Sequence, residues 1–289
     1  MPFMSTKFRQ DPVRLLLLAC TTSLTMVACA QKSHKGSLFL HWGYNRAWFS
    51  WSDIHFNGPD YDFTLRHVVA KDRPEPFGAA YFEIKNIWIP QYNYRAGWYF
   101  HERWSLSLGL DHMKYVVQDG QTVRMDGYIN GSRSIRYTTT EGSRDVKLEK
   151  DLLQFEHTDG LNLLSVDLDH YDPVWSTTSG KLNLRAFEGV HAGPVIPRTD
   201  VRLFGKGINN RFNVAGVAVG AQIGLQLDFL HHFYVRSTLK AGWVDLPKVL
   251  TTGNNEDHAS QHFWFVQHAI VLGGRINLHR DTKASVPEE

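Results

Sequence analysis

The feature of this sequence that most constrains its fold is a two-residue alternation of apolar and polar side chains. Between residues 217 and 228, every second side chain is apolar, and those between them are small or polar. Successive side chains of a β-strand point to opposite faces of a sheet, so each such segment is predicted to form a strand. Helical spacing is nearly absent, which predicts an all-β fold. The alternating segments are 38–45, 61–69, 91–100, 104–111, 152–157, 161–169, 182–191, 217–228, 233–241 and 264–278.

Two classes of β protein show this alternation. A soluble β-sandwich turns its apolar faces inward, whereas a membrane β-barrel turns them to lipid and keeps polar faces in the lumen. The polar faces here mix glycine and small residues with long charged ones, and aromatic residues gather at segment ends. The segments also have the length that a tilted strand needs to cross a bilayer. We therefore predict a single antiparallel transmembrane β-barrel with a polar, filled lumen. A secreted or lipid-anchored β-sandwich binding protein is the alternative.

The predicted lumen residues lie on the polar faces of these segments, and the predicted girdle residues are tryptophans. The lumen set is Arg95, Asp111, Arg185, Gln222, Gln226, Arg236, Lys240 and Arg275. The aromatic girdle set is Trp42, Trp48, Trp51, Trp98, Trp104 and Trp243. A filled lumen favours a structural, recognition or narrow-pore role, because a wide channel needs about 16 strands.

The positions of the turns set the expected number of strands. Outer-membrane barrels have short turns on the periplasmic side and longer loops outside. Placing all the tight turns on one side requires additional strands at 78–88 and 199–205, which gives about twelve strands. Without these two stretches, about ten strands remain. The tight turns are predicted at 100–104, 158–160 and 229–233, and the long outer connections at 47–60, 118–147 and 246–261.

Residues 1–30 have the composition of a secretory signal peptide. Basic residues precede the apolar stretch 15–27, and small residues then lead to a predicted cleavage after Ala30. The alternative is a lipoprotein leader in which Cys29 is lipidated. The sequence thus predicts an exported protein of the cell outer membrane. The remaining boundaries are a linker at 31–35, the barrel at 36–278 and a disordered polar tail at 279–289.

Charge and cysteine content exclude several functions. The chain has 31 Lys and Arg against 29 Asp and Glu, and without residues 1–30 these counts become 28 and 28. A neutral chain has no electrostatic footprint for nucleic acid. Both cysteines, Cys20 and Cys29, lie in the predicted leader, so the mature chain has no disulfide, zinc–thiolate site or thiol nucleophile. Outside the N-terminus the chain has no apolar run long enough for a membrane-spanning helix.

Six stretches of the sequence resemble a known family. They are IPQYNYRAGWYF, LSLGLDHMKYVV, FEHTDGLN, AGPVIPRTDVRLFGKG, LKAGWVDLP and ASQHFWF, in this order. Together they are similar to outer-membrane β-barrel proteins of Bacteroidota to which no activity is assigned. The likeness spans roughly residues 36–278. It implies a barrel architecture and an outer-membrane location, and it brings no reaction.

One constellation could carry chemistry. His157 and Thr158, with Ser165 and Asp167 downstream, loosely resemble the His-x-Ser-Asn pattern of barrel esterases that act on lipid A or phospholipids. Such a site needs an imidazole next to a hydroxyl and a carboxylate that orients the ring. However, Asp159 occupies the nucleophile position, and Thr-Asp-Gly is also a common turn sequence. Our first prediction is therefore a protein without enzymatic activity, and a lipid ester hydrolase is the alternative function.

The remaining polar clusters and loops give predictions about ligands and partners. His231 and His232 lie in a predicted turn, and His258, His262 and His268 flank an outer loop without recognisable metal-ligand spacing. We therefore expect no metal and no cofactor. Outer-membrane lipids are the expected partners. An envelope protein or a glycan at the outer loops is the other expected partner, because exposed aromatic residues can stack on sugar rings or anchor a protein.

Overall fold

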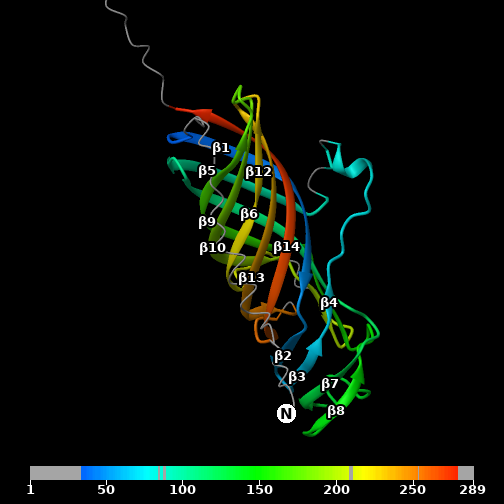
Figure 1. Cartoon of the computed structure of the whole chain (residues 1–289). Helices are drawn as coiled ribbons and strands as arrows, with labels where there is room; N and C mark the ends of the chain where they lie inside the picture. The colour runs from blue at the N-terminus through cyan, green and yellow to red at the C-terminus, as the bar shows by residue number, and fades with distance from the viewer. Residues whose placement is uncertain (1–33, 84, 87–88, 208–210, 253, 279–289) are drawn as a thin grey trace, which may run out of the picture.

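The long alternating segments of the sequence form a closed antiparallel ring of strands (Figure 1). The computed structural model describes residues 34–278 except 84, 87–88, 208–210 and 253, so the predicted leader and tail lie outside the described residues. The all-β antiparallel barrel predicted from the sequence is confirmed. The ring consists, in spatial order, of β1 (Ser37–Phe49), β5 (Tyr92–His101), β6 (Trp104–Val117), β9 (Leu153–Ser176), β10 (Leu182–Pro197), β12 (Gly216–Phe229), β13 (Phe233–Leu250) and β14 (His258–Asn277).

The first and last strands of the chain close this ring. β1 and β14 pair over their whole common length, from Ser37 opposite Asn277 to Phe49 opposite Phe265. Closure leaves no open edge along the ring, so the backbone N–H and C=O groups find partners in the neighbouring strands. No helix in the described part of the chain is long and apolar enough to cross a lipid bilayer.

The two ends of the ring differ in the length of their connections. At the short-turn end, β5 joins β6 through two residues, β12 joins β13 through three and β9 joins β10 through five. The start of β1 and the end of β14 lie at this end too. The connections at the other, long-loop end are 50–91, 118–152, 198–215 and 251–257. This asymmetry is typical of outer-membrane barrels.

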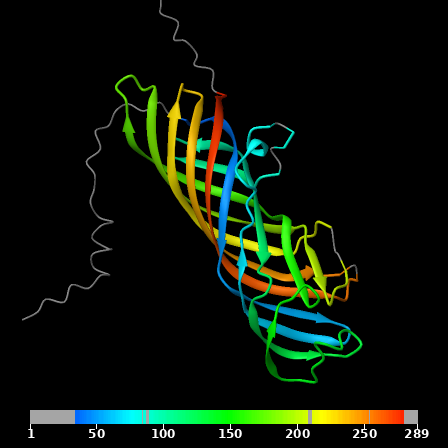
Figure 2. The same ribbon diagram turned by 90° about the vertical axis from the view of Figure 1, so that its right-hand side faces the viewer.

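A second group of strands extends the sheet beyond the long-loop end. β2 (Ser52–Gly58) pairs with the start of β14, and β3 (Tyr61–Val68), β7 (Thr122–Ile129) and β8 (Ser143–Lys147) follow it in order. We call these four strands the extension sheet. Figure 2 shows it continuing past the end of the ring. The remaining elements are β4 (Ala70–Lys71) beside β6, β11 (Asp200–Leu203) beside β9, and the short 3-10 helix η1 (Ala79–Tyr81).

The ring has eight strands, so the predicted count of ten to twelve was too high. The segments 152–157 and 161–169 belong to one strand, β9, and the segment 61–69 is β3 of the extension sheet. The stretch 78–88 holds η1 and no strand in its described part, and 199–205 contains β11, which lies beside the ring. All three predicted long connections lie at the long-loop end, although each contains residues of strands.

The turn predicted at 158–160 is a bulge inside β9. Met113 pairs with Leu161 and Tyr115 with His157, so three residues of β9 lie opposite the single residue Lys114 of β6. Gly160 adopts a φ of +113°, which glycine accepts at little cost. A bulge increases the local bend and lets the strand continue. The Asp-Gly pair therefore marks a bend where the sequence predicted a hairpin.

Candidate functional site

The interior of the ring is occupied by buried ion pairs. Arg95 donates to both oxygens of Asp111 at 2.9 Å, and its Nε donates to Asp167 at 2.6 Å. Lys240 donates to the same two carboxylates, at 2.7 Å to Asp111 and 3.3 Å to Asp167. All four side chains are buried, and they come from four different strands. Buried charges are tolerated when each is paired and hydrogen-bonded, as these are.

Two further groups of buried, paired charges lie closer to the short-turn end, and the first is centred on Arg236. Arg236 donates to Asp169 at 2.9 Å and to the Tyr171 hydroxyl at 2.8 Å, and its guanidinium carbon lies 3.6 Å from the centre of the Phe187 ring.

The second group is centred on Asp228. Arg275 donates to one of its oxygens at 2.8 Å, and the Nε of Arg185 lies 2.9 Å from the other. Gln226 also donates to Asp228, at 2.9 Å.

These side chains fill the ring. The hollow that the described residues leave among His41, Arg95, Arg236 and Lys240 has a volume of about 10 Å³, no more than a single water molecule needs. The structure places all eight predicted lumen residues in this interior, where each is buried. Asp169 and Tyr171 belong to the same network and were not among the candidates. The alternation of the sequence could have identified them, because they follow Ser165 and Asp167 at every second position on the polar face of β9.

The outward face of the ring is an apolar belt. On β12, five outward side chains are 38–58% exposed to solvent, and they are Val217, Val219, Ile223, Leu225 and Leu227. Leu106 and Leu108 on β6 and Ile270 and Leu272 on β14 continue the belt around the ring. With a rise of roughly 3.3 Å per residue and a tilt of about 40°, the span from 217 to 227 covers about 25 Å. That is the height of the apolar band of a transmembrane barrel.

The polarity of the two faces inverts along single strands. On β13, the inward residues Arg236 and Lys240 are charged, whereas the later inward residues Val244 and Leu246 are apolar and fully buried. The outward face changes in the opposite sense, from the exposed Leu239 to the exposed Asp245.

β9 shows the same inversion. Its inward residues are apolar at Phe155 and Leu163 and polar at Asp167 and Asp169. At the long-loop end the inward apolar residues form one cluster with the buried face of the extension sheet, which we call the outer core. At the long-loop end the inward face is therefore apolar and the outward face polar, as in a soluble protein. In the belt the inward face is polar and the outward face apolar.

The predicted girdle residues all lie on or near the outward face. Trp98 and Trp104 are exposed at the short-turn end, and Trp48 and Trp51 are exposed at the long-loop end. Trp243 is half-buried against Trp264, a strongly exposed tryptophan that was not among the candidates. Trp42 lies between the two rows, with its ring 4.7 Å from that of Tyr44.

The structure does not bring the candidate catalytic residues together. His157 is buried in the outer part of β9, where its Nδ1 lies 2.9 Å from the hydroxyl of Thr199. Ser165 is eight positions further along the same strand, and its hydroxyl donates to Asp167 at 3.2 Å within the ion network. The side chain of Thr158 lies outside the described residues. Among the described candidates there is therefore no imidazole next to a hydroxyl nucleophile on an accessible surface.

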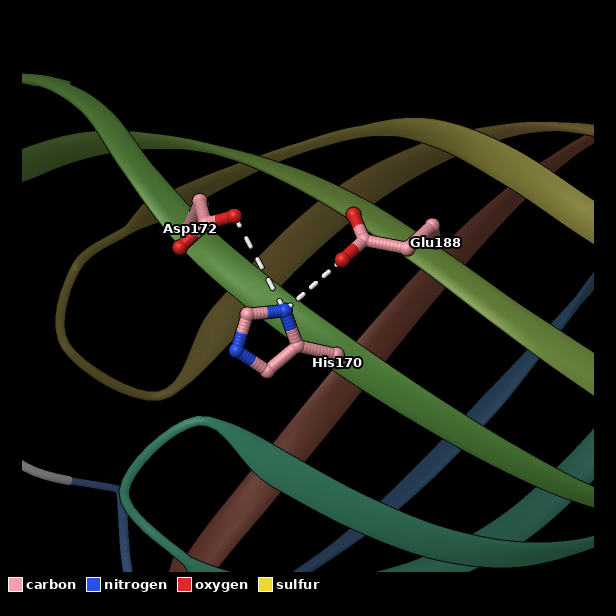
Figure 3. A group of neighbouring side chains, drawn as sticks. All are labelled: His170, Asp172 and Glu188. Atoms are coloured by element: carbon pink, nitrogen blue, oxygen red, sulfur yellow. Dashed lines mark hydrogen bonds and ion pairs between the residues drawn. The ribbon is translucent and has the colours of Figure 1, made fainter. Parts of the chain in front are cut away.

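A charged cluster interrupts the belt near the short-turn end (Figure 3). The Nδ1 of His170 lies 2.8 Å from Glu188 and 3.7 Å from Asp172. Arg103 donates to Asp172 at 3.2 Å, and the His170 ring lies 4.8 Å from that of Trp104. His170, Asp172 and Glu188 have the types of ligand atom found in cation sites, but each of them already has a protein partner. The pairing explains how acidic groups are accommodated beside the aromatic row, where headgroups replace acyl chains.

A pocket of about 410 Å³ opens at the long-loop end between the extension sheet and the neighbouring loops. Its wall includes the rings of Tyr61 and Phe204, which lie 5.5 Å apart. Arg133 lies over the Tyr61 ring, and the Tyr61 hydroxyl donates to Asp257 at 2.9 Å. Burial and the neighbouring Asp257 carboxylate raise the pKa of Tyr61 above its ordinary value. Lys206 also lines the pocket, which thus combines aromatic surface with charges of both signs.

The solvent face of the extension sheet carries its own ion pairs. Arg66 of β3 donates to Asp126 of β7 at 2.7 Å and to Asp53 of β2 at 2.9 Å. Ser143 of β8 also donates to Asp126. The hydrogen bonds from Ser143 and Arg66 lower the pKa of Asp126 to about 2. A single carboxylate therefore links the strands β3, β7 and β8.

Comparison with known proteins gives similarity of fold only. No family model and no curated protein matches the sequence. OprG from Pseudomonas aeruginosa is similar at a TM-score of 0.43 and 10% identity, covering 86% of this chain and 99% of that one. The N-terminal barrel domain of OprF from the same species covers 84% and 98% at a TM-score of 0.27 and 9% identity. Ail from Yersinia pestis covers 82% and 99% at 0.27 and 10%. At such values, function has to be inferred from this chain's own residues.

Proposed function

We propose that this chain is an outer-membrane β-barrel protein whose ring anchors the extension sheet and loops outside the membrane. The observation that carries this proposal is the inversion of polarity along β13, from Arg236 and Lys240 inside the belt to Val244 and Leu246 inside the outer core. In a soluble protein, buried ion pairs are not expected behind an exposed apolar face. They are expected in a ring that is surrounded by lipid over part of its height.

The proposed orientation follows from the connections. The short turns face the periplasm, and the extension sheet and long loops face outward. Export by the leader 1–30, with cleavage after Ala30 or lipidation at Cys29, belongs to the same proposal, as does membership of the barrel family of Bacteroidota. Outer-membrane lipids are the proposed partners of the belt.

The filled interior supports a structural or recognition role over transport. Diffusion through the ring would require the paired side chains around Arg95, Asp111 and Lys240 to separate, and each of them would then lose its buried partner. The pocket at the long-loop end, which Tyr61, Phe204 and Lys206 line, supports recognition of a glycan or an envelope protein. A narrow pore is the competing role, and steady single-channel currents in planar bilayers would support it.

Electrophoresis of membrane-extracted protein tests the proposal. Folded transmembrane barrels resist detergent, so the unheated protein is expected to migrate differently from the boiled protein. The protein is also expected to stay with the membrane pellet after washing at high pH. Release into the wash, together with equal migration of the heated and unheated samples, would contradict an integral barrel and favour the soluble alternative.

A further inference from the structure

The connection between β4 and β5 does not extend away from the ring like the other long loops. In both views it turns back and lies alongside the outer wall, with η1 beside the ring and not beyond its end (Figures 1 and 2). Residues 72–83 of this connection contain an aromatic cluster of Phe77, Tyr81 and Phe82. We call residues 72–83 the flap.

Tyr81 fixes the flap to the wall. The Tyr44 hydroxyl donates to the Tyr81 carbonyl at 2.7 Å, and the two rings lie 4.7 Å apart. Arg46 donates to the Tyr81 hydroxyl at 2.8 Å, and that hydroxyl donates in turn to the Glu75 carbonyl at 2.8 Å. Tyr81 is buried as a result. These contacts of Tyr81 with Tyr44 and Arg46 hold the flap in a defined position on the wall.

The flap is attached within the height of the apolar belt. Tyr44 and Arg46 are successive outward positions of β1, and Trp48 follows them toward the long-loop end. Leu38 and Leu40, on the same face toward the short-turn end, are exposed belt residues. A bare arginine at this height would face acyl chains at a high free-energy cost. The Tyr81 hydroxyl gives Arg46 a partner there.

The flap turns apolar surface away from the wall. Phe77 is 79% exposed and Phe82 is 75% exposed, with their ring centres 5.8 Å apart. Lys71 and Lys85, on either side of the flap, are exposed. Exposed aromatic rings are typical of segments that lie at the boundary between headgroups and acyl chains, where Lys71, Lys85 and the exposed Glu83 can reach the headgroups.

From these contacts we propose that the flap is a lipid-seated element, with Phe77 and Phe82 inserted into the leaflet on the long-loop side. The occupant of its outer surface is lipid, because the surface continues the apolar belt. The flap gives the ring a second contact with the membrane, outside the wall itself. This inference rests on the proposed function, since it requires the belt to face lipid.

Fluorescence quenching by lipids tests the flap independently of the barrel. In a chain with Cys20 and Cys29 replaced by Ser, single substitutions Phe82→Cys, Leu225→Cys and Ile135→Cys each receive a bimane label. The proteins are reconstituted in phosphatidylcholine vesicles with or without nitroxide-labelled phosphatidylcholine. Leu225 reports on the belt, and Ile135 is a strongly exposed apolar residue of the β7–β8 connection.

The labels at 82 and 225 are expected to be quenched and the label at 135 to stay bright. Quenching at 225 without quenching at 82 would overturn the flap proposal and leave the barrel intact. Absence of quenching at both sites would overturn the proposed function itself.

Discussion

Lys240 on β13 donates to Asp111 on β6 at 2.7 Å, and the two residues form an ion pair that crosses the interior of the ring. β6 and β13 lie four positions apart in the ring of eight strands, so this contact joins opposite walls. Arg95 and Asp167 complete the cluster between them. The ring is therefore held together by interior charge pairs as well as by its backbone hydrogen bonds.

Removing the cation from this cluster should destabilise the folded barrel. Lys240→Met leaves Arg95 as the only cation of this cluster beside Asp111 and Asp167, and loss of one partner from a buried ion pair costs about 3–5 kcal/mol. Unfolding by guanidinium chloride from lipid vesicles measures the loss. Asp111→Asn in the Lys240→Met background should restore part of the stability, because it removes the carboxylate charge that Lys240 had balanced. Equal stability of wild type and Lys240→Met would contradict the role of the pair.

The inversion of polarity predicts that substitution by arginine has a different cost at two places on the same face. Leu239 and Asp245 are both exposed outward residues of β13. Leu239→Arg places a charge in the belt and should cost about 2–4 kcal/mol near the middle of the bilayer. Asp245 lies opposite Val217 at the long-loop edge of the belt and is already charged, so Asp245→Arg should cost only about 0–1 kcal/mol. The free energy of unfolding from vesicles distinguishes them, and equal costs would refute the position of the belt.

Acid should weaken the link between the strands of the extension sheet. The folded pKa of Asp126 is lowered to about 2, below the value of about 3.9 of a free aspartate. Its contribution to stability is therefore fully present above about pH 4 and is lost as the pH falls through about 2. Carbon-13 NMR of the carboxyl group follows the titration directly. Ser143→Ala removes one hydrogen bond and should raise the midpoint, whereas a midpoint near 3.9 in the wild type would contradict the network.

The hydrolase alternative and the structural role of His157 differ in what a substitution does. Because His157 is buried and accompanied by Thr199, His157→Ala should leave a cavity in the outer core and lower the unfolding midpoint. Acyl release from outer-membrane lipids should be the same for wild type, His157→Ala and Ser165→Ala. Release that is present in the wild type and absent from both variants, with the barrel still folded, would instead establish a lipid hydrolase.

The sequence predicted the ring and its interior because each depends on one local rule. Alternation along 217–228 assigns Gln222 and Gln226 to one face and Leu225 to the other, and the structure follows that assignment. Arg236 and Lys240 were predicted in the lumen by the same rule. The partners of these residues come from distant strands, so the pairs themselves could not be read from any single segment.

The strand count failed where a local pattern had more than one structural meaning. Asp159-Gly160 is typical of a hairpin, but the pairing of β6 with β9 continues on both sides of it. The strands β7 and β8 were hidden in a stretch rich in glycine, serine and charge, because their outward faces meet water and only Val123, Met125, Ile129 and Val146 face the outer core. The flap carries no period at all, and its attachment to Arg46 depends on contacts between distant residues.

The most direct test of the membrane-facing belt is the behaviour of the refolded protein in buffer without any amphiphile, measured by light scattering after size-exclusion chromatography. The exposed belt predicts aggregation under these conditions and a single folded species only when detergent or lipid is added. A monodisperse, folded monomer in plain buffer would contradict it, because an apolar surface of this extent could not then face water.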